Sequence, residues 1–155
     1  MALCSVGLVA ALIGATLAGW LGISQWGFYE NARIDQELRA HTESDGELIG
    51  FVYRIPSPAL DAHAEIGHLI LADDAIEIKT ETQTLKIQKS EVMAISREPN
   101  IHSLLGLGGW IVLTLKTSEA LKLESRKYNT MLRSRIHSKK LCEELRTWKN
   151  ERAPA

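Results

Sequence analysis

The chain has 155 residues, a formal net charge of −1 and a pI near 6.5. This length is enough for one ordinary domain plus an appendage, and the near-neutral charge argues against a dedicated nucleic-acid-binding protein, whose surface is usually basic. Charge is nonetheless distributed unevenly. No charged side chain precedes residue 30, residues 30–98 carry 7 Lys/Arg against 14 Asp/Glu, and residues 122–152 carry 10 against 4. The chain therefore has three regions of different chemistry.

Residues 1–29 are predicted to form a transmembrane helix. From Val6 to Ile23 the sequence is an almost unbroken apolar run, and at about 1.5 Å per residue it approaches the ~30 Å hydrocarbon thickness of a bilayer. Aromatic residues, which favour the headgroup layer, cluster where the run ends: Trp20, Trp26, Phe28 and Tyr29. Two alternatives are a cleaved signal peptide, which would normally have Lys or Arg before its apolar run, and a buried helix of a soluble domain.

Small residues recur along this segment at a spacing of four. They are Ala10, Gly14, Ala18 and Gly22, and a second set lies beside them at Ala11, Ala15 and Gly19. A helix places residues four apart on one face, and a face of small residues lets another transmembrane helix approach closely. The alternative is that Gly and Ala are simply common in membrane helices. We expect the segment to pack on helices of other membrane proteins or of a larger membrane complex.

The distribution of Lys and Arg predicts the orientation of the segment. Only the α-amino group precedes it, whereas Arg33 and Arg39 follow it closely. Because positive charge accumulates on the cytoplasmic side, we expect a single-pass protein whose C-terminal domain is cytoplasmic.

Residues 30–46 are predicted to be a juxtamembrane helix and linker. Asp35 and Arg39 are spaced as an i,i+4 ion pair, and "TESDG" supplies the turn residues that end the helix. The chain thus divides into a transmembrane helix at 1–29, this juxtamembrane segment at 30–46, and a domain at 47–155.

Beyond the linker, the hydrophobic period changes from helical to alternating. Alternation and turn residues predict seven short strands: "ELIGFVYRI", "HLIL", "AIEIKT", "TLKIQK", "VMAISR", "WIVLTLK" and "ALKLES". In the last of them Leu121 and Leu123 alternate with Lys122 and Glu124. From about residue 130 the period is helical again, and the residues expected to face the sheet are Leu132, Ile136, Leu141, Leu145 and Trp148.

Seven antiparallel strands followed by an amphipathic helix resemble the pleckstrin-homology-like superfold, and in particular bacterial PH-like and GRAM-like domains. The resemblance rests on "GHLILADDAIEIKTETQTLKIQKSEVMAISRE", on "GWIVLTLKTSEALKLES" and on the final helix, and it spans residues 47–149. It implies a β-barrel or sandwich capped by a C-terminal helix. Lipid-binding members usually hold a phosphoinositide with Lys and Arg around the first two strands, where this chain has only Arg54 beside Asp61 and Glu65. This difference favours a protein ligand.

No motif in the sequence predicts catalysis, a metal site or a cofactor. The five histidines never form a metal-ligand spacing, and Asp73 and Asp74 are adjacent in a turn. The "LLGLGGW" stretch leads into a strand, unlike phosphate-binding glycine loops, which lead into a helix. Cys4 and Cys142 lie at opposite ends of the chain with no redox or zinc spacing. We therefore expect a protein that is not an enzyme.

Two functional hypotheses follow. The first is a membrane-anchored accessory subunit whose apolar helix packs on partner helices and whose domain docks a protein on the cytoplasmic face. The second is a peripheral domain that recognises anionic lipid through its basic C-terminal helix. The residues that would contact lipid or a partner are Arg126, Lys127, Arg133, Arg135, Lys139 and Lys140. A solvated helix face is the alternative explanation for these charges.

Overall fold

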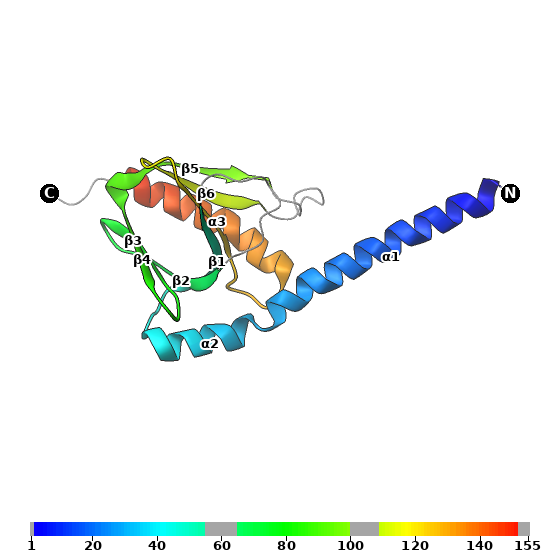
Figure 1. Cartoon of the computed structure of the whole chain (residues 1–155), viewed down its shortest axis with the longest axis horizontal. Coiled ribbons are helices and arrows are strands. Elements are labelled where there is room, and N and C mark those ends of the chain that lie inside the picture. Colours follow the sequence, from blue (N-terminus) through cyan, green and yellow to red (C-terminus); the bar gives the residue numbers. More distant parts are fainter. Residues whose placement is uncertain (1, 55–64, 100–108, 152–155) are drawn as a thin grey trace.

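The computed structural model describes residues 2–54, 65–99 and 109–151, and it confirms the predicted architecture: a long apolar helix, a curled antiparallel sheet and a C-terminal helix (Figure 1). Part of the glycine-rich loop, including Gly106 and Gly108, lies outside the described residues. The elements in chain order are α1 (Ala2–Tyr29), α2 (Asn31–Thr42), β1 (Glu47–Arg54), β2 (Glu65–Leu71), β3 (Ala75–Lys79), β4 (Thr84–Gln88), the 3₁₀ turn η1 (Lys89–Glu91), β5 (Val92–Glu98), β6 (Trp110–Leu115), β7 (Ala120–Ser125) and α3 (Met131–Asn150).

All seven predicted strands are present, and the alternating apolar residues face the interior as expected. In β3, for example, Ile76 and Ile78 are fully buried whereas Glu77 between them is half-buried. The main difference is that β2 begins at Glu65, upstream of the predicted "HLIL". Its added residue Gly67 lies so close to β3 that a Cβ atom there would be 2.9 Å from the Lys79 carbonyl oxygen.

The seven strands form one sheet in the order β4-β3-β2-β1-β7-β6-β5, so the two edge strands are neighbours in sequence. Laid flat, strands at the two edges would be about 29 Å apart, at roughly 4.8 Å per strand. The three-residue turn η1 that joins them can span no more than about 14 Å. The sheet must therefore curl until its edges approach one another, which produces a half-barrel.

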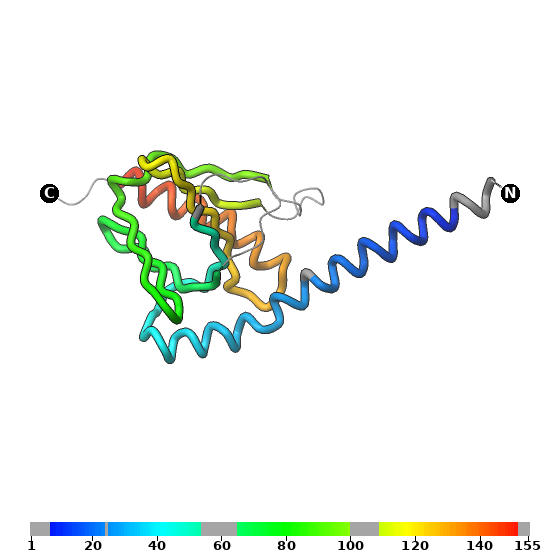
Figure 2. The backbone as a smooth tube through the Cα atoms, in the orientation of Figure 1, coloured from blue at the N-terminus to red at the C-terminus, as the bar shows by residue number. Residues whose placement is uncertain are grey.

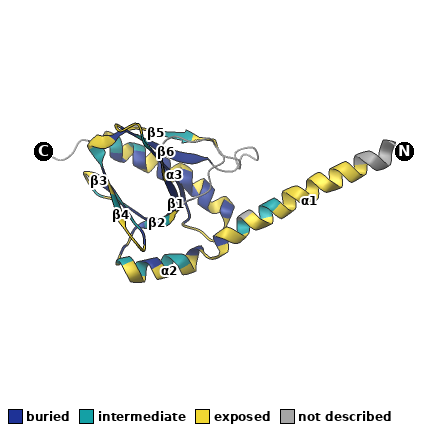
Figure 3. Ribbon diagram, in the orientation of Figure 1, coloured by how far each residue is buried: buried dark blue, intermediate teal, exposed yellow. Residues whose placement is uncertain are grey.

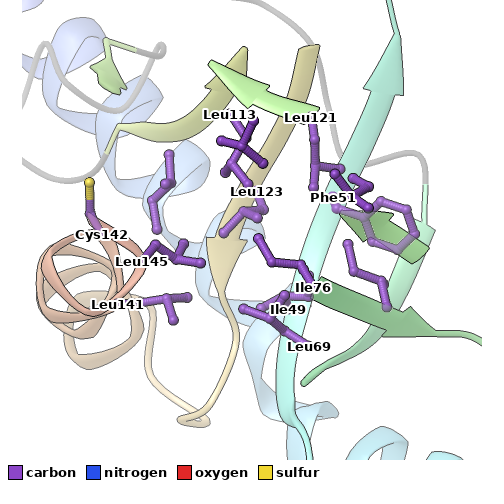
Figure 4. Packing of buried hydrophobic residues seen from close by; sticks show 14 of the residues in the cluster. Ile49, Phe51, Leu69, Ile76, Leu113, Leu121, Leu123, Leu141, Cys142 and Leu145 are labelled. Carbon is purple, nitrogen blue, oxygen red and sulfur yellow. The ribbon is translucent and has the colours of Figure 1, made fainter. Parts of the chain in front are cut away.

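Helix α3 packs on the half-barrel and completes its core. Leu141 and Leu145 are buried against residues of the sheet such as Ile49 and Leu123 (Figure 4). At the far end of the helix, the Trp148 indole donates a hydrogen bond to the Ala72 carbonyl at 2.6 Å. The predicted role of this helix is confirmed.

The buried face of α3 differs from the predicted one. Leu132 and Ile136 are 50% and 60% exposed, so their assignment to the sheet-facing side was wrong. The positions facing the sheet in these turns are Ser134 and Ser138, small polar residues whose hydroxyls are hydrogen-bonded: Ser138 donates to the Ser134 carbonyl at 3.2 Å and accepts from the Ser125 amide of β7 at 2.9 Å. Small side chains allow the first half of α3 to lie close to β7.

Strand β7, in the interior of the sheet, is buried on both faces. Lys122 and Glu124 alternate with Leu121 and Leu123, as predicted, but they are only 4% and 2% exposed. On the outer face Lys122 lies opposite Val52 of β1 and Val112 of β6, which belong to a second apolar cluster. Alternation thus predicted the inward residues correctly but not the burial of the outer face.

Candidate functional site

Helix α1 projects from the half-barrel as a separate rod, exposed along most of its length (Figures 1 and 3). Its 28 residues span roughly 42 Å at the usual helical rise. By length and composition it is long and apolar enough to cross a membrane, and it begins near the N-terminus. The domain therefore leaves most of this apolar surface uncovered.

Helix α1 is continuous through the set of small residues, so their spacing of four places them on one face of the helix. Ala10, Gly14, Ala18 and Gly22 are all exposed, and a Cβ atom added at either glycine would meet nothing within 4 Å. Thr16 lies on the opposite side of the helix, where its hydroxyl donates back to the Leu12 carbonyl at 2.9 Å. The face is available for close approach by another helix.

A buried polar cluster fixes the end of α1 to the half-barrel. Asn31, 1% exposed, donates through its side-chain amide to the carbonyls of Arg126 and Tyr128, both at 2.8 Å. The same side chain accepts from Arg126 Nε at 3.0 Å and Nη2 at 2.8 Å. Arg126 also donates to the Gly27 carbonyl and lies 4.8 Å from the centroid of the buried Phe28 ring. These contacts hold α1 in one direction relative to the domain.

A second contact joins α1 to the start of α3. Gln25 Nε2 donates to the Asn129 carbonyl at 2.8 Å, and Gln25 Oε1 accepts from the Met131 amide at 3.0 Å. The Asn129 side chain in turn accepts from the Ala32 amide at 3.0 Å. The first turn of α3 therefore lies at the level of the last turns of α1.

Helix α2 lies beneath the half-barrel and packs on it (Figure 2). Leu38 is 2% exposed, and Asp35 Oδ1 lies 2.8 Å from Nε2 of the buried His68 on β2. Arg39 pairs with Asp35 at 3.1 Å and donates to the Gly46 carbonyl at 2.9 Å. The chain passes so close to β2 at Gly46 that a Cβ atom would be 2.7 Å from the Leu69 carbonyl. The predicted Asp35–Arg39 pair thus also secures α2 to the sheet.

The six basic residues singled out from the sequence are not brought together on one surface. Arg126 and Arg135 are buried at 7% and 4% exposure, and burial lowers the pKa of both guanidinium groups, with Glu124 opposing the shift. Arginine nevertheless stays charged in proteins, so these two are structural cations. The exposed residues of the set are Lys127, Arg133, Lys139 and Lys140.

Two hollows lie close to the junction, the region where α1 and α2 meet the half-barrel. One, of about 170 Å³, separates α2 from the start of β1 and is lined by charges of both signs: Asp35, Arg39, Asp45, Glu47 and Lys127. The other, of about 330 Å³, is an open depression along α3 lined by Tyr128, Arg133, Ile136, His137 and Lys140. His137 Nε2 at its edge lies 2.7 Å from Glu47 Oε2.

Neither the cluster at Asn31 nor the pair at Asp35 and His68 was predicted from the sequence, because each joins segments far apart in the chain.

Within the described ranges, no three His, Cys, Asp or Glu side chains lie close enough together to hold a metal ion. Cys142 is a free thiol buried in the core, and burial raises its pKa. Tyr53 shares a 2.7 Å hydrogen bond with Glu119, which raises the pKa of the phenol to about 12. These shifts therefore arise from burial and local pairing, not from a cluster of reactive groups.

No protein-family model matches the chain, and no curated protein matches it.

Proposed function

We propose that this protein is a membrane-anchored accessory subunit with no enzymatic activity of its own. Its apolar helix α1 crosses the bilayer and packs on helices of other membrane proteins through Ala10, Gly14, Ala18 and Gly22. Its half-barrel, a PH-like domain on the cytoplasmic side, docks a protein partner. No cofactor is required for this role.

The observation that carries the proposal is the fixed junction between α1 and the half-barrel. A tether that only retains a domain at a membrane needs no defined direction, and a flexible linker would serve. Here Asn31 and Arg126 use buried hydrogen bonds to hold the helix and the domain together. A subunit that must engage one partner in the bilayer and another outside it benefits from such a fixed geometry, because both contacts can then form without further ordering.

The exposed small-residue face supports the same proposal. Inside lipid, helices associate through close packing rather than through the hydrophobic effect, and small residues permit the closest approach. The PH-like assignment is supported by the strand order, the curl of the sheet and the packed C-terminal helix. Cytoplasmic placement is supported by Arg33 and Arg39, which follow the apolar run.

Recognition of anionic lipid by the whole basic set is the weaker candidate. Arg126 and Arg135 are engaged in the interior, so a headgroup could reach four of the six residues without disturbing the fold. The charges of the set are also divided between the loop after β7 and two different turns of α3.

The test is affinity purification of the tagged full-length chain from native membranes in mild detergent. We expect a defined set of membrane proteins to co-purify with the wild type and to be lost from Gly14→Leu and Ala18→Leu variants. Thr16→Leu is the matched control, since it adds bulk to the opposite face of α1 and should retain the partners. Retention of all partners by Gly14→Leu and Ala18→Leu would contradict helix packing through this face.

A further inference from the structure

The outward face of α3 carries apolar, basic and acidic side chains that do not pack on the sheet. Leu132 and Ile136 project from its first two turns at 50% and 60% exposure. Farther along the same face come two cations, Lys139 and Lys140, and then two carboxylates, Glu143 and Glu144. Helical geometry places these residues on the side opposite Leu141 and Leu145, which pack on the sheet.

The contact with α1 sets the depth at which this face begins. The Met131 amide binds the side chain of Gln25, which is two residues past Ile23, the end of the apolar run. Two helical residues correspond to about 3 Å, and the headgroup layer on each side of a bilayer is roughly 5–7 Å thick. If α1 crosses the membrane, the first turn of α3 lies within the headgroup layer. From there α3 runs away from α1 (Figure 1).

The cations on this face have few carboxylate partners within the fold. In the part of the chain that the structure describes, Arg133 and Lys139 make no ion pair, and Lys140 has only a 3.5 Å pair with the exposed Glu144. Arg133, Ile136 and Lys140 line the open 330 Å³ depression together with Tyr128 and His137. Long basic side chains extend their charge toward phosphates while their stems stay on apolar surface.

We propose that the outward face of the first three turns of α3 rests on the membrane surface. Leu132 and Ile136 enter the headgroup layer, and Arg133, Lys139 and Lys140 bind the phosphates of anionic lipids. The carboxylates at Glu143 and Glu144 then lie beyond the layer, in water. The inference rests on α1 crossing the bilayer, as in the proposed function, but it does not depend on a partner helix. Lipid is favoured over a protein as the occupant because the two exposed apolar residues lie nearest the membrane, the three cations lie beside and just beyond them, and the carboxylates lie farthest away.

The test measures whether lipid or water surrounds chosen positions in the full-length chain. Nitroxide labels are attached at Leu132→Cys, Ile136→Cys, Glu143→Cys and Leu12→Cys, each in a Cys4→Ser, Cys142→Ala background whose fold is checked by circular dichroism. The protein is reconstituted in nanodiscs of phosphatidylcholine, with or without phosphatidylglycerol. Collision with oxygen, which concentrates in lipid, is compared with collision with a water-soluble nickel complex.

We expect oxygen to be the more effective collider at residues 12, 132 and 136, and the nickel complex at residue 143. Water exposure at residues 132 and 136 with lipid exposure at residue 12 would overturn this inference and leave the proposed function intact. Water exposure at residue 12 would overturn both. Shielding of residue 136 from both colliders would place protein over the face and overturn lipid contact.

The role of the cations is tested in the same samples. Arg133→Gln combined with Lys140→Gln should lower the oxygen accessibility of residue 136 in nanodiscs that contain phosphatidylglycerol. Each cation near an anionic surface increases partitioning onto that surface by about fivefold. Removing two cations should therefore weaken the contact of this face with the bilayer by a readily measured amount. Lys86→Gln combined with Lys116→Gln removes equal charge from exposed positions outside α3 and should have no effect. Equal results for the two pairs would overturn the assignment of phosphate binding to Arg133 and Lys140.

Discussion

Arg126 Nε donates to Asn31 Oδ1 at 3.0 Å, joining residues 95 positions apart in the chain. The bond links the segment after β7 to the first residue of α2, and Phe28 covers the guanidinium from the side of α1. One buried cluster therefore connects α1, α2 and the half-barrel. It explains why α2, within the segment predicted as a juxtamembrane helix and linker, packs against the half-barrel.

Replacement of Asn31 by Ala should loosen this junction and destabilise the domain. The variant removes two hydrogen-bond donors and the acceptor for a buried guanidinium, and a buried polar or charged group left unsatisfied is costly. We expect the free energy of unfolding to fall by about 3 kcal/mol. Urea unfolding of the full-length chain in detergent micelles, followed by tryptophan fluorescence, measures this change.

A second readout separates loss of stability from loss of orientation. Spin labels at Tyr29→Cys and Lys127→Cys, in the cysteine-substituted background, should give one narrow distance distribution that broadens with Asn31→Ala. Asn129→Ala, which removes only an exposed bond to the Ala32 amide, is the matched control and should cost about 1 kcal/mol or less. Unchanged stability and distances in Asn31→Ala would show that the cluster does not hold the junction.

The face of α3 that packs on the sheet can be tested with two leucines of the same helix. Leu145 is fully buried, so Leu145→Ala should lower the free energy of unfolding by about 2–5 kcal/mol through the lost contacts and the cavity left behind. Leu132 is half exposed, and Leu132→Ala should change it by less than about 0.5 kcal/mol. The same urea titration compares the two, and similar losses in both variants would contradict the packing described above.

The sequence predicted the strands well because alternation records burial directly. Ile76 and Ile78 alternate with polar residues and face the core. The sheet-facing side of α3 was less predictable because the helical period of apolar residues does not reveal small polar residues that are buried. Ser134 and Ser138 are buried instead, since small polar side chains whose hydroxyls are hydrogen-bonded suit a close helix–strand contact.

The candidate site was harder to predict because its partners are distant in sequence. Arg126 and Arg135 belong to a run of cations that resembles a solvated face, and nothing local distinguishes them from Arg133. Burial of Arg126 requires Asn31 and Phe28, which the fold brings to it from near the other end of the chain. The pairing of Asp35 with His68 likewise depends on where α2 packs.

Stability should fall in mildly acidic solution because of His68. Its Nε2 lies 2.8 Å from Asp35, its Nδ1 is buried with no hydrogen-bond partner among the described residues, and burial lowers the pKa of the ring below its ordinary value of 6.5. The Asp35 carboxylate opposes this shift and Arg39 adds to it, but burial is the largest cause. The folded state therefore binds the proton less readily than the unfolded chain does.

The sign of the pH dependence follows from this lowered pKa. The stabilisation is complete above pH 6.5, the unfolded value, and is lost as the pH falls below it toward the folded pKa. Urea midpoints measured at several values between about pH 5 and 8 should decline on the acidic side. His68→Gln, which cannot titrate, should be less stable at pH 8 but show a flatter profile, whereas His41→Gln, at an exposed position on α2, should keep the wild-type slope. Parallel profiles for the wild type and His68→Gln would assign the acid sensitivity to other groups.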